Sequence, residues 1–120
     1  MKRDMELIRR IPLQLEADTE LFPTTVLKLQ RHSQAEIGYH MLLLFDAGLV
    51  EGHSAGSKGD PYGYMAERLT WDGHDFLNLA RNDSVWKKAM SGLAEKGLDV
   101  TIDILTTYLA KLTKKMLMLG

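Results

Sequence analysis

The stretch from Ser33 to Val50, SQAEIGYHMLLLFDAGLV, constrains the fold more than any other part of the chain. Ser33 and Glu36 have the spacing of a capping box, in which a serine hydroxyl accepts a hydrogen bond from the backbone three residues on and a glutamate reaches back to the cap. Gly48 supplies the left-handed residue that commonly ends a helix. The pattern therefore predicts a helix that begins after Ser33, runs through Asp46 and passes directly into a strand.

The apolar residues of this predicted helix occupy more than one of its faces. Recurrence at steps of three and four predicts a stripe that packs in the core, and it consists of Ile37, Met41, Leu44 and Phe45. Three further large side chains fall outside this stripe, namely Tyr39, Leu42 and Leu43. A helix that is apolar nearly all round is usually contacted from several sides, so we expect it at the centre of the fold. His40 lies at the edge of the stripe and is expected to be half-buried and hydrogen-bonded.

The residues before the central helix are predicted to support it. Apolar residues recur at helical spacing over residues 1–17, which predicts a first helix. Pro12 lacks the amide that would bond to the carbonyl of Ile8, so this helix is expected to bend at the proline or to begin again there. Thr24–Gln30 is short and rich in β-branched and apolar residues, which favours a strand; a short helix is the competing prediction.

A hairpin is predicted after the central helix. Leu49–His53 and Tyr64–Leu69 have the length and composition of strands. The residues between them are rich in Gly, Ser, Asp and Pro, which is typical of a long loop. The two strands are therefore expected to pair as neighbours in an antiparallel sheet.

Helices are predicted beyond the hairpin. Thr70 is the expected N-cap of a helix over WDGHDFLNLAR. Asn82 or Asp83 begins the next helix, which is expected to end around Gly92 and Gly97.

Residues 98–120 carry a heptad seam. Asp99 is the predicted cap of this segment. Apolar residues alternate along it at steps of four and three: Leu98, Ile102, Leu105, Leu109, Leu112, Met116 and Leu119. This C-terminal seam either packs on the first helix within one subunit or pairs with its twofold mate, and we favour the homodimer. The candidate dimer-interface residues are Ile102, Leu105, Leu109, Leu112 and Met116.

Length and composition limit the class of protein. A chain of 120 residues is long enough for one modest core, so we expect a single domain over residues 1–120, with 1–97 as its core and 98–120 as a packing or dimerisation helix. The sequence contains no cysteine, which excludes disulfides, thiolate metal sites and thiol catalysis. The charged start MKRDMELIRR does not resemble a signal peptide and no apolar run approaches membrane-spanning length, so we expect a cytoplasmic location and no membrane.

The order of elements and two sequence motifs resemble known families. Helix, short strand, helix and a two-stranded hairpin is the order of a winged-helix domain, and IGYHMLLLFDAGLV is similar to the recognition helix and first wing strand of bacterial repressors of the arsenic-regulator type. Over nearly the whole chain, the MKRD opening and the LTWDGHDFL motif resemble an uncharacterised family of bacterial and phage proteins, a domain of unknown function with a predicted winged-helix fold. The resemblance implies the fold and carries no catalytic residues.

The predicted recognition helix has an unfavourable charge for DNA. A formal net charge of −1 gives no global attraction to phosphate, and the outward face of the helix carries Glu36 and Asp46 but no Lys or Arg. Cationic and hydrogen-bonding side chains lie nearby in the sequence, and these are the candidate nucleic-acid-binding residues: Lys28, Arg31, Gln34, Tyr39, Lys58 and Tyr62. Because phosphate neutralisation supplies most non-specific affinity, any DNA site must be a local basic patch.

The cluster Asp72-Gly73-His74-Asp75 invites a metal or acid–base interpretation. At a helix start, however, the two carboxylates suit the positive end of the helix dipole, and a metal would need a further ligand on the same face. The sequence has no Ser-His-Asp order, phosphate loop or dinucleotide fingerprint. We therefore predict no metal, no cofactor and no enzymatic activity.

Together these observations predict an α+β winged-helix protein, made of a helix, a short strand, a helix and a two-stranded wing, with additional C-terminal helices. The expected function is that of a non-enzymatic, DNA-binding or transcription-regulator-like protein, with double-stranded DNA and a second copy of the chain as partners. The alternative is a protein–protein interaction module that keeps the winged-helix shape, binds no nucleic acid and has a protein partner.

Overall fold

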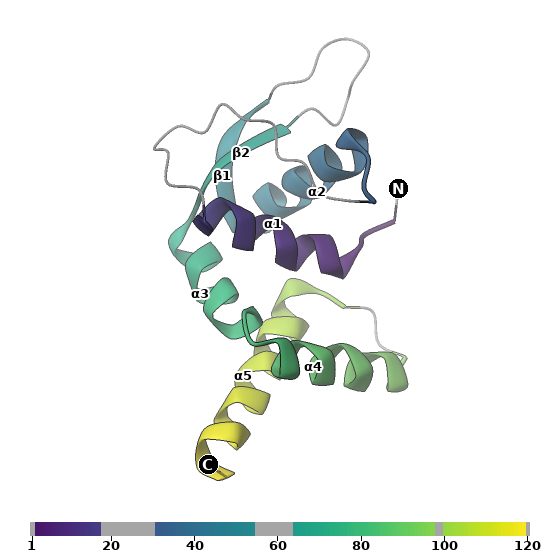
Figure 1. Cartoon of the computed structure of the whole chain (residues 1–120), viewed down its shortest axis with the longest axis vertical. Coiled ribbons are helices and arrows are strands. Elements are labelled where there is room, and N and C mark those ends of the chain that lie inside the picture. Colours follow the sequence, from purple (N-terminus) through teal and green to yellow (C-terminus); the bar gives the residue numbers. More distant parts are fainter. Residues whose placement is uncertain (1, 18–30, 55–63, 98–99, 120) are drawn as a thin grey trace. The chain divides into compact units, whose positions relative to one another are not determined.

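The structure is a computed structural model that describes residues 2–17, 31–54, 64–97 and 100–119. Over these residues the chain is α+β, with five helices and a two-stranded antiparallel sheet (Figure 1). The elements follow in the order α1 (Met5–Ala17), α2 (Gln34–Asp46), β1 (Val50–Ser54), β2 (Tyr64–Leu69), α3 (Trp71–Ala80), α4 (Asp83–Glu95) and α5 (Ile102–Leu119). The chain divides into two compact units, Met1–His74 and Asp75–Gly120.

Helix α1 is uninterrupted at its internal proline. Asp4 precedes it, and the carboxylate of Asp4 accepts a hydrogen bond from the amide of Glu6 at 2.9 Å. Pro12 lies inside the helix and is buried together with Leu7, Ile8 and Ile11. Of the two predicted alternatives at Pro12, a bend or a restart, the restart is therefore wrong. The proline still removes one hydrogen bond, but α1 packs on α2 and β2, and the burial of its apolar face offsets that loss.

Both predicted ends of the central helix α2 are confirmed. At its start the hydroxyl of Ser33 accepts a hydrogen bond from the amide of Glu36 at 3.1 Å, and the Glu36 carboxylate accepts one from the amide of Ser33, which completes the capping box. At its end Gly48 has a φ of 77°. The amides of Gly48 and Leu49 donate to the carbonyls of Phe45 and Leu44, both at 2.9 Å. This is the Schellman arrangement, in which a left-handed glycine stops the helix.

The faces of α2 are only partly as predicted. Ile37, Met41 and Leu44 are buried. Phe45, which the spacing placed in the same stripe, is 45% exposed, so its assignment to the core is wrong. Its ring instead lies over the ring of Tyr64 in β2, with centroids 4.9 Å apart. Phe45 is the penultimate residue of α2, and its ring contact is with the hairpin.

His40 replaces Phe45 as the fourth buried residue of α2. It is 1% exposed, so the expectation of a half-buried ring is corrected to full burial. Its Nδ1–H donates to the carbonyl of Glu36 at 2.7 Å, and its Nε2 accepts a hydrogen bond from the amide of Asp4 at 2.7 Å. Because Nε2 can accept only when it carries no proton, these partners specify the neutral ring with hydrogen on Nδ1. His40 thereby joins the start of α1 to the middle of α2.

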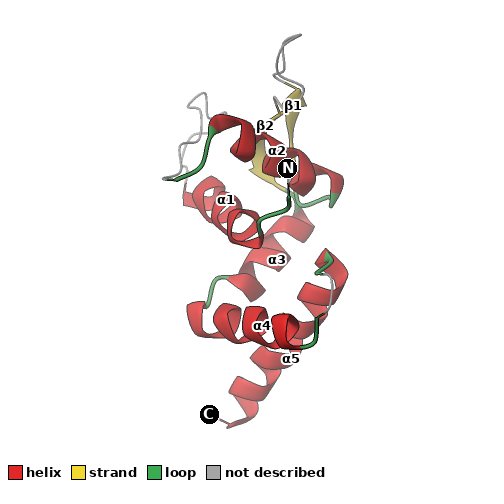
Figure 2. Ribbon diagram, turned by 90° about the vertical axis from the view of Figure 1, so that its right-hand side faces the viewer, coloured by secondary structure: helices red, strands yellow, loops and turns green. Residues whose placement is uncertain are grey.

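The predicted hairpin is confirmed by β1 and β2, which lie against α2 in the first unit (Figures 1 and 2). Val50 pairs with Leu69 at the base and Ser54 pairs with Tyr64 at the far end, with an irregularity between Glu51 and Gly52. The residues between the strands, 55–63, and the predicted strand Thr24–Gln30 lie outside the part of the chain that the structure describes.

Thr70 fastens the end of α2 to the start of α3. Its hydroxyl donates to the carbonyl of Gly48 at 2.6 Å and accepts a hydrogen bond from the amide of Gly73 at 3.0 Å, which confirms it as the N-cap. Its own amide donates to the carbonyl of Leu49 at 3.0 Å. A Cβ at position 73 would lie 2.0 Å from the Leu49 carbonyl oxygen, so only glycine permits this approach. We call this group of residues the Thr70 junction.

The second unit contains the predicted helices with two changes at their ends. Asn82 caps α4 by accepting a hydrogen bond from the amide of Val85 at 3.1 Å, as expected. Gly92 does not end α4 but lies within it, and the left-handed residue after the helix is Gly97, with a φ of 63°. The predicted cap Asp99 lies outside the described residues, and α5 is capped by Thr101 instead, whose hydroxyl accepts from the amide of Ile104 at 3.1 Å.

The core of the second unit lies where α4 packs on α5. Trp86, Ala89 and Leu93 of α4 are buried, as are Leu105 and Leu109 of α5. These side chains remove a continuous apolar surface from water, which is the main stabilising contribution expected for a pair of short helices.

We predict that Gly73→Ala lowers the free energy of unfolding by about 1–3 kcal/mol, because the added methyl group can be accommodated only by moving backbone. The measurement is urea denaturation followed by circular dichroism. The matched control is His74→Ala, at the next position of the same helix, where the side chain is exposed and the change should stay within about 0.5 kcal/mol. Equal losses for the two variants would contradict the close approach at Gly73.

Candidate functional site

The start of α2 carries two of the predicted nucleic-acid-binding residues. Arg31 is exposed and adopts a φ of 69°, which is uncommon for a residue other than glycine. Gln34 is the first residue of α2 and is also exposed. The structure therefore brings a guanidinium and a side-chain amide to the same end of the helix. We call this the Arg31–Gln34 end.

Tyr39 does not belong to this group. It follows Gln34 by five positions, which places it about 140° further round a helix with 3.6 residues per turn. Its side chain is half-buried, and its ring meets that of His40 edge-on, with centroids 5.6 Å apart. The remaining candidates, Lys28, Lys58 and Tyr62, lie outside the described residues.

Acidic partners accompany several basic groups of the hairpin and of α2. Arg68 donates to the carboxylate of Glu51 across the two strands, and His53 pairs with Glu67 further along the sheet. At the start of α2, Nδ1 of His32 lies 3.2 Å from the carboxylate of Glu36. Over the whole first unit the sequence has eight Lys and Arg residues against eleven Asp and Glu residues. The first unit therefore carries more negative than positive formal charge, which is unfavourable for contact with phosphate.

Two side chains of the first unit have perturbed pKa values. The hydrogen bond from His32, followed by the backbone hydrogen bond from Ser33, lowers the pKa of the Glu36 carboxyl below its ordinary value of 4.5. Burial raises the pKa of the Tyr64 phenol. Tyr64 lies beneath Phe45 and is 9% exposed, so it is not available to stack on a nucleic-acid base.

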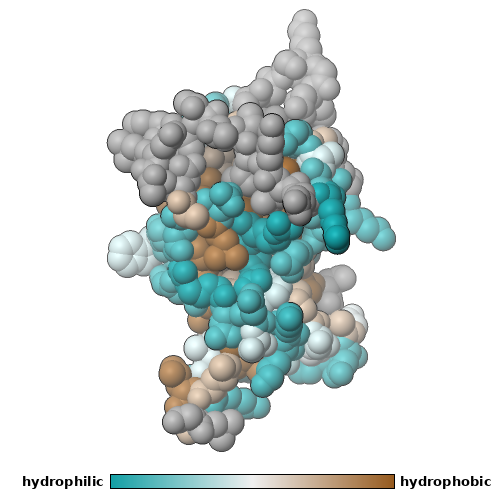
Figure 3. All heavy atoms as spheres, viewed as in Figure 1, coloured by the Kyte–Doolittle hydropathy of each residue, from teal (hydrophilic) through white to brown (hydrophobic). Residues whose placement is uncertain are grey.

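The C-terminal seam is divided along α5. Leu105 and Leu109 are fully buried, and Ile102 and Leu112 are half-buried. Met116 is 43% exposed. The apolar surface continues at positions that the heptad did not select, since Leu117 is 77% and Met118 is 85% exposed. Figure 3 shows hydrophobic side chains at this C-terminal end of α5.

The Asp72–Asp75 cluster opens α3 with exposed side chains at Asp72, His74 and Asp75. Asp72 lies in the first turn of the helix, where a carboxylate interacts favourably with the helix dipole. Among the described residues, no three His, Asp or Glu side chains are close enough to hold a metal ion together. Over the same residues, no helix has both the length and the hydrophobicity needed to cross a lipid bilayer.

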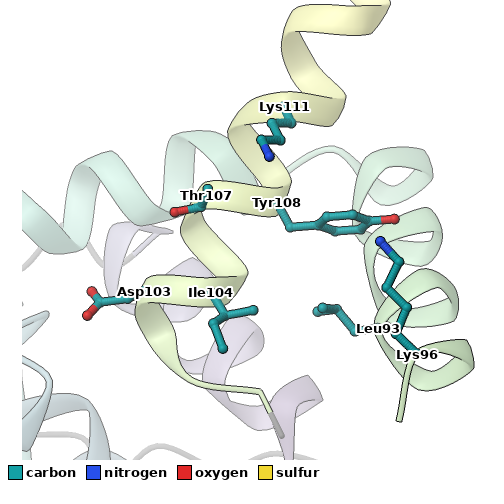
Figure 4. A pocket seen from close by; sticks show the side chains of 7 residues that line it. All are labelled: Leu93, Lys96, Asp103, Ile104, Thr107, Tyr108 and Lys111. Atoms are coloured by element: carbon teal, nitrogen blue, oxygen red, sulfur yellow. The ribbon is translucent and has the colours of Figure 1, made fainter. Parts of the chain in front are cut away.

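One hollow on the surface was not anticipated from the sequence. It lies between α4 and α5 and has Lys96, Tyr108 and Lys111 among its lining residues (Figure 4). Gly92, a glycine inside a helix, was the sequence signal that could have drawn attention to it, because such a glycine often marks the close approach of another group. The partner of that glycine could not be read from the sequence.

We predict that the pH dependence of stability contains a contribution from Glu36. Because folding lowers the pKa of this carboxyl, its stabilising effect is present above about pH 4.5 and is lost as the pH falls through the lowered value. Glu36→Gln keeps the capping box, since glutamine serves the same role. The variant should be less stable than the wild type at neutral pH and should approach it under acidic conditions, measured by urea denaturation across pH.

The control for this prediction is a double-mutant cycle with His32→Asn. That substitution removes the main cause of the shift, so adding Glu36→Gln to it should change the pH dependence little. Equal effects of Glu36→Gln in both backgrounds would show that His32 is not the partner that matters.

Comparisons with known proteins identify the family. The chain is 33% identical over 121 residues to a protein of Haemophilus influenzae named "Uncharacterized protein", and the match covers 98% of this chain and 99% of that protein. No solved structure matches the chain. A family described as "Hypothetical protein (DUF2513)" matches residues 2–99. The predicted resemblance to a domain of unknown function is thereby confirmed, and the chain belongs to the DUF2513 family.

Proposed function

We propose that this protein is a non-enzymatic winged-helix protein that binds double-stranded DNA in the manner of a transcription regulator. The observation that carries the proposal is the exposed Arg31–Gln34 end of α2, on a helix that packs against α1 and an antiparallel hairpin. In helix-turn-helix proteins the N-terminal residues of the recognition helix contact base edges in the major groove. Arginine and glutamine are suited to this task because they can form paired hydrogen bonds with guanine and adenine respectively.

The charge distribution sets the expected strength of binding. The candidate cations of the first unit are Arg31, Lys28 and Lys58. Arg31 is exposed, Lys28 precedes α2 in the sequence, and Lys58 lies between the two strands in the sequence. Three phosphate contacts per protomer give a log–log salt slope of about −3, which is shallow for a DNA-binding protein. The proposed interaction is therefore weak at physiological salt and strongest at low salt.

We expect the protein to retard mixed-sequence duplex DNA on a gel at low salt, with retardation lost as salt is added. Arg31→Ala should weaken binding and reduce the salt slope by about one, because it removes one phosphate-type cation. Gln34→Ala should leave the slope unchanged. Lys87→Ala, an exposed lysine of the second unit, is the matched control and should behave as the wild type. Absence of retardation at low salt would overturn the proposal.

A protein–protein interaction module is the second candidate, and the paired charges favour it. The ion pairs of the hairpin leave Arg68 and His53 engaged with carboxylates rather than directed to phosphate. On α2, Phe45 is 45% exposed and Leu42 and Leu43 are half-buried, so part of an apolar surface remains accessible to a protein partner. This candidate takes precedence if the gel experiment shows no DNA binding.

We further propose that the protein is a homodimer through the C-terminal end of α5. Leu105 and Leu109 are already buried within the chain. The contact between subunits would therefore use Met116 and the neighbouring exposed side chains of Leu117 and Met118. Burial of such side chains against a twofold mate would remove apolar area that otherwise faces water.

We expect sedimentation at micromolar concentration to report a dimer for the wild type. Met116→Glu combined with Leu117→Lys should yield a folded monomer, because a charge buried in a subunit contact without a partner is costly. Lys114→Glu, which alters an exposed lysine of the same helix, is the control for a change of charge alone. A wild type that sediments only as a monomer would contradict this proposal.

A further inference from the structure

The groove between α4 and α5 is a candidate ligand site outside the surfaces considered so far. It lies wholly within the second unit and has a volume of about 330 Å³. Ligand pockets for small molecules begin at about 300 Å³, so this groove matches a compact ligand. Its walls come from the C-terminal end of α4 with the residue that follows it, and from α5 between Asp103 and Lys111 (Figure 4).

The inner surface of the groove is apolar and depends on Gly92. Leu93 of α4 is buried and Ile104 of α5 is 39% exposed, so both present hydrocarbon to the groove. The ring of Tyr108 lies between the two helices. A Cβ at position 92 would come within 2.2 Å of the Tyr108 hydroxyl oxygen, so the glycine makes room for the ring to lie against α4.

Two ammonium groups stand at the rim of this apolar surface. Nζ of Lys96 lies 5.4 Å from the centroid of the Tyr108 ring, within the range of a cation–π interaction. Lys111 follows Tyr108 by three positions and therefore shares its side of α5. Figure 4 shows the Asp103 carboxylate directed away from Tyr108 and Lys96. The groove thus combines positive charge at its rim with an uncharged interior.

We propose that this groove binds a small amphipathic carboxylate, a molecule with one anionic group and a compact aromatic or aliphatic body. The body would lie on Leu93, Ile104 and Tyr108, and the carboxylate would accept charge-assisted hydrogen bonds from Lys96 and Lys111. A neutral ligand would accept only weaker hydrogen bonds from these lysines, because it lacks the negative charge, and a cationic ligand would be repelled by both of them. The combination of apolar interior and cationic rim therefore selects for this chemical class.

A neighbouring hollow shares Thr107 and Lys111 with the groove and also has Lys114 in its wall, but its described lining has no aromatic side chain on which a ring could lie. Two of its other lining residues are Thr106 and Thr113, whose hydroxyls already donate to the carbonyls of Ile102 and Leu109 at 2.6 and 2.8 Å. Those hydroxyls have no further proton to offer a carboxylate. The Lys96–Lys111 groove is therefore the site that we assign.

The test is a titration of the full-length, ¹⁵N-labelled protein with 3-phenylpropionate, followed by amide chemical shifts. We expect saturable shifts centred on residues 93, 96, 104 and 108, weakened by added salt because the lysines are exposed and screened. The matched ligands are 3-phenylpropanamide and 3-phenylpropylamine, which keep the ring and replace the anion with a neutral and a cationic group. Both should bind more weakly than the carboxylate.

Substitutions separate the charge from the shape of the groove. Lys96→Gln and Lys111→Gln should each weaken 3-phenylpropionate binding by about two- to fivefold, the range expected for an exposed ion pair. Lys87→Gln, on the helix that Lys96 caps, should leave binding unchanged. Gly92→Ala should alter binding of the carboxylate and the amide alike, because it displaces the Tyr108 ring without removing a charge. Circular dichroism verifies that each variant is folded.

The proposal is overturned if the carboxylate, amide and amine bind equally, if the Lys96→Gln/Lys111→Gln double variant binds as the wild type, or if the shifts centre elsewhere. None of the groove residues belongs to the Arg31–Gln34 end. Failure of ligand binding would therefore leave the DNA proposal intact, and the converse also holds.

Discussion

The Thr70 junction is the interaction on which the first unit depends. The Thr70 hydroxyl donates to the carbonyl of Gly48, just beyond α2, and accepts a hydrogen bond from the amide of Gly73 in the first turn of α3. The Thr70 amide donates to the carbonyl of Leu49. Because Gly73 lets the backbone of α3 approach Leu49 so closely, the exit of α2, the base of the hairpin and the entry to α3 are fixed at one point. A hydrogen-bonded junction of this kind satisfies helix-end groups that would otherwise need water.

This junction and His40 act on different parts of the same helix. His40 lies in the middle of α2, where its Nε2 accepts a hydrogen bond from the amide of Asp4, just before α1, and its Nδ1–H donates to the carbonyl of Glu36 within α2. The Schellman turn and Thr70 hold the C-terminal end of α2. With α2 held at these points, the Arg31–Gln34 end is left facing solvent at the start of the helix. The exposed Arg31–Gln34 end is the basis of the proposed DNA binding, whereas the excess of acidic residues in this unit limits how much phosphate contacts could add to the affinity. The first property favours a DNA-binding function, and the second favours the protein–protein interaction module.

In the second unit, different parts of α5 form the core, line the groove and remain exposed to solvent. The first half of α5 contributes Leu105 and Leu109 to the core with α4, and the same turns place Tyr108 and Lys111 beside the groove. Beyond them, Met116, Leu117 and Met118 are exposed. A heptad pattern reports only that one face of a helix is apolar. It does not distinguish the part buried within the chain from the part left for another molecule.

The sequence by itself determined the features that depend on neighbouring residues. These are the capping box at Ser33, the glycine at Gly48 that ends α2, the caps at Thr70 and Asn82, and the two strands of the hairpin. Each depends on residues within a few positions of one another. Tertiary structure alone decided that α1 continues through Pro12, that His40 rather than Phe45 is buried, and that Gly92 faces Tyr108. These outcomes depend on which distant surface covers a residue, and helical spacing defines the faces of a helix without specifying what packs against each.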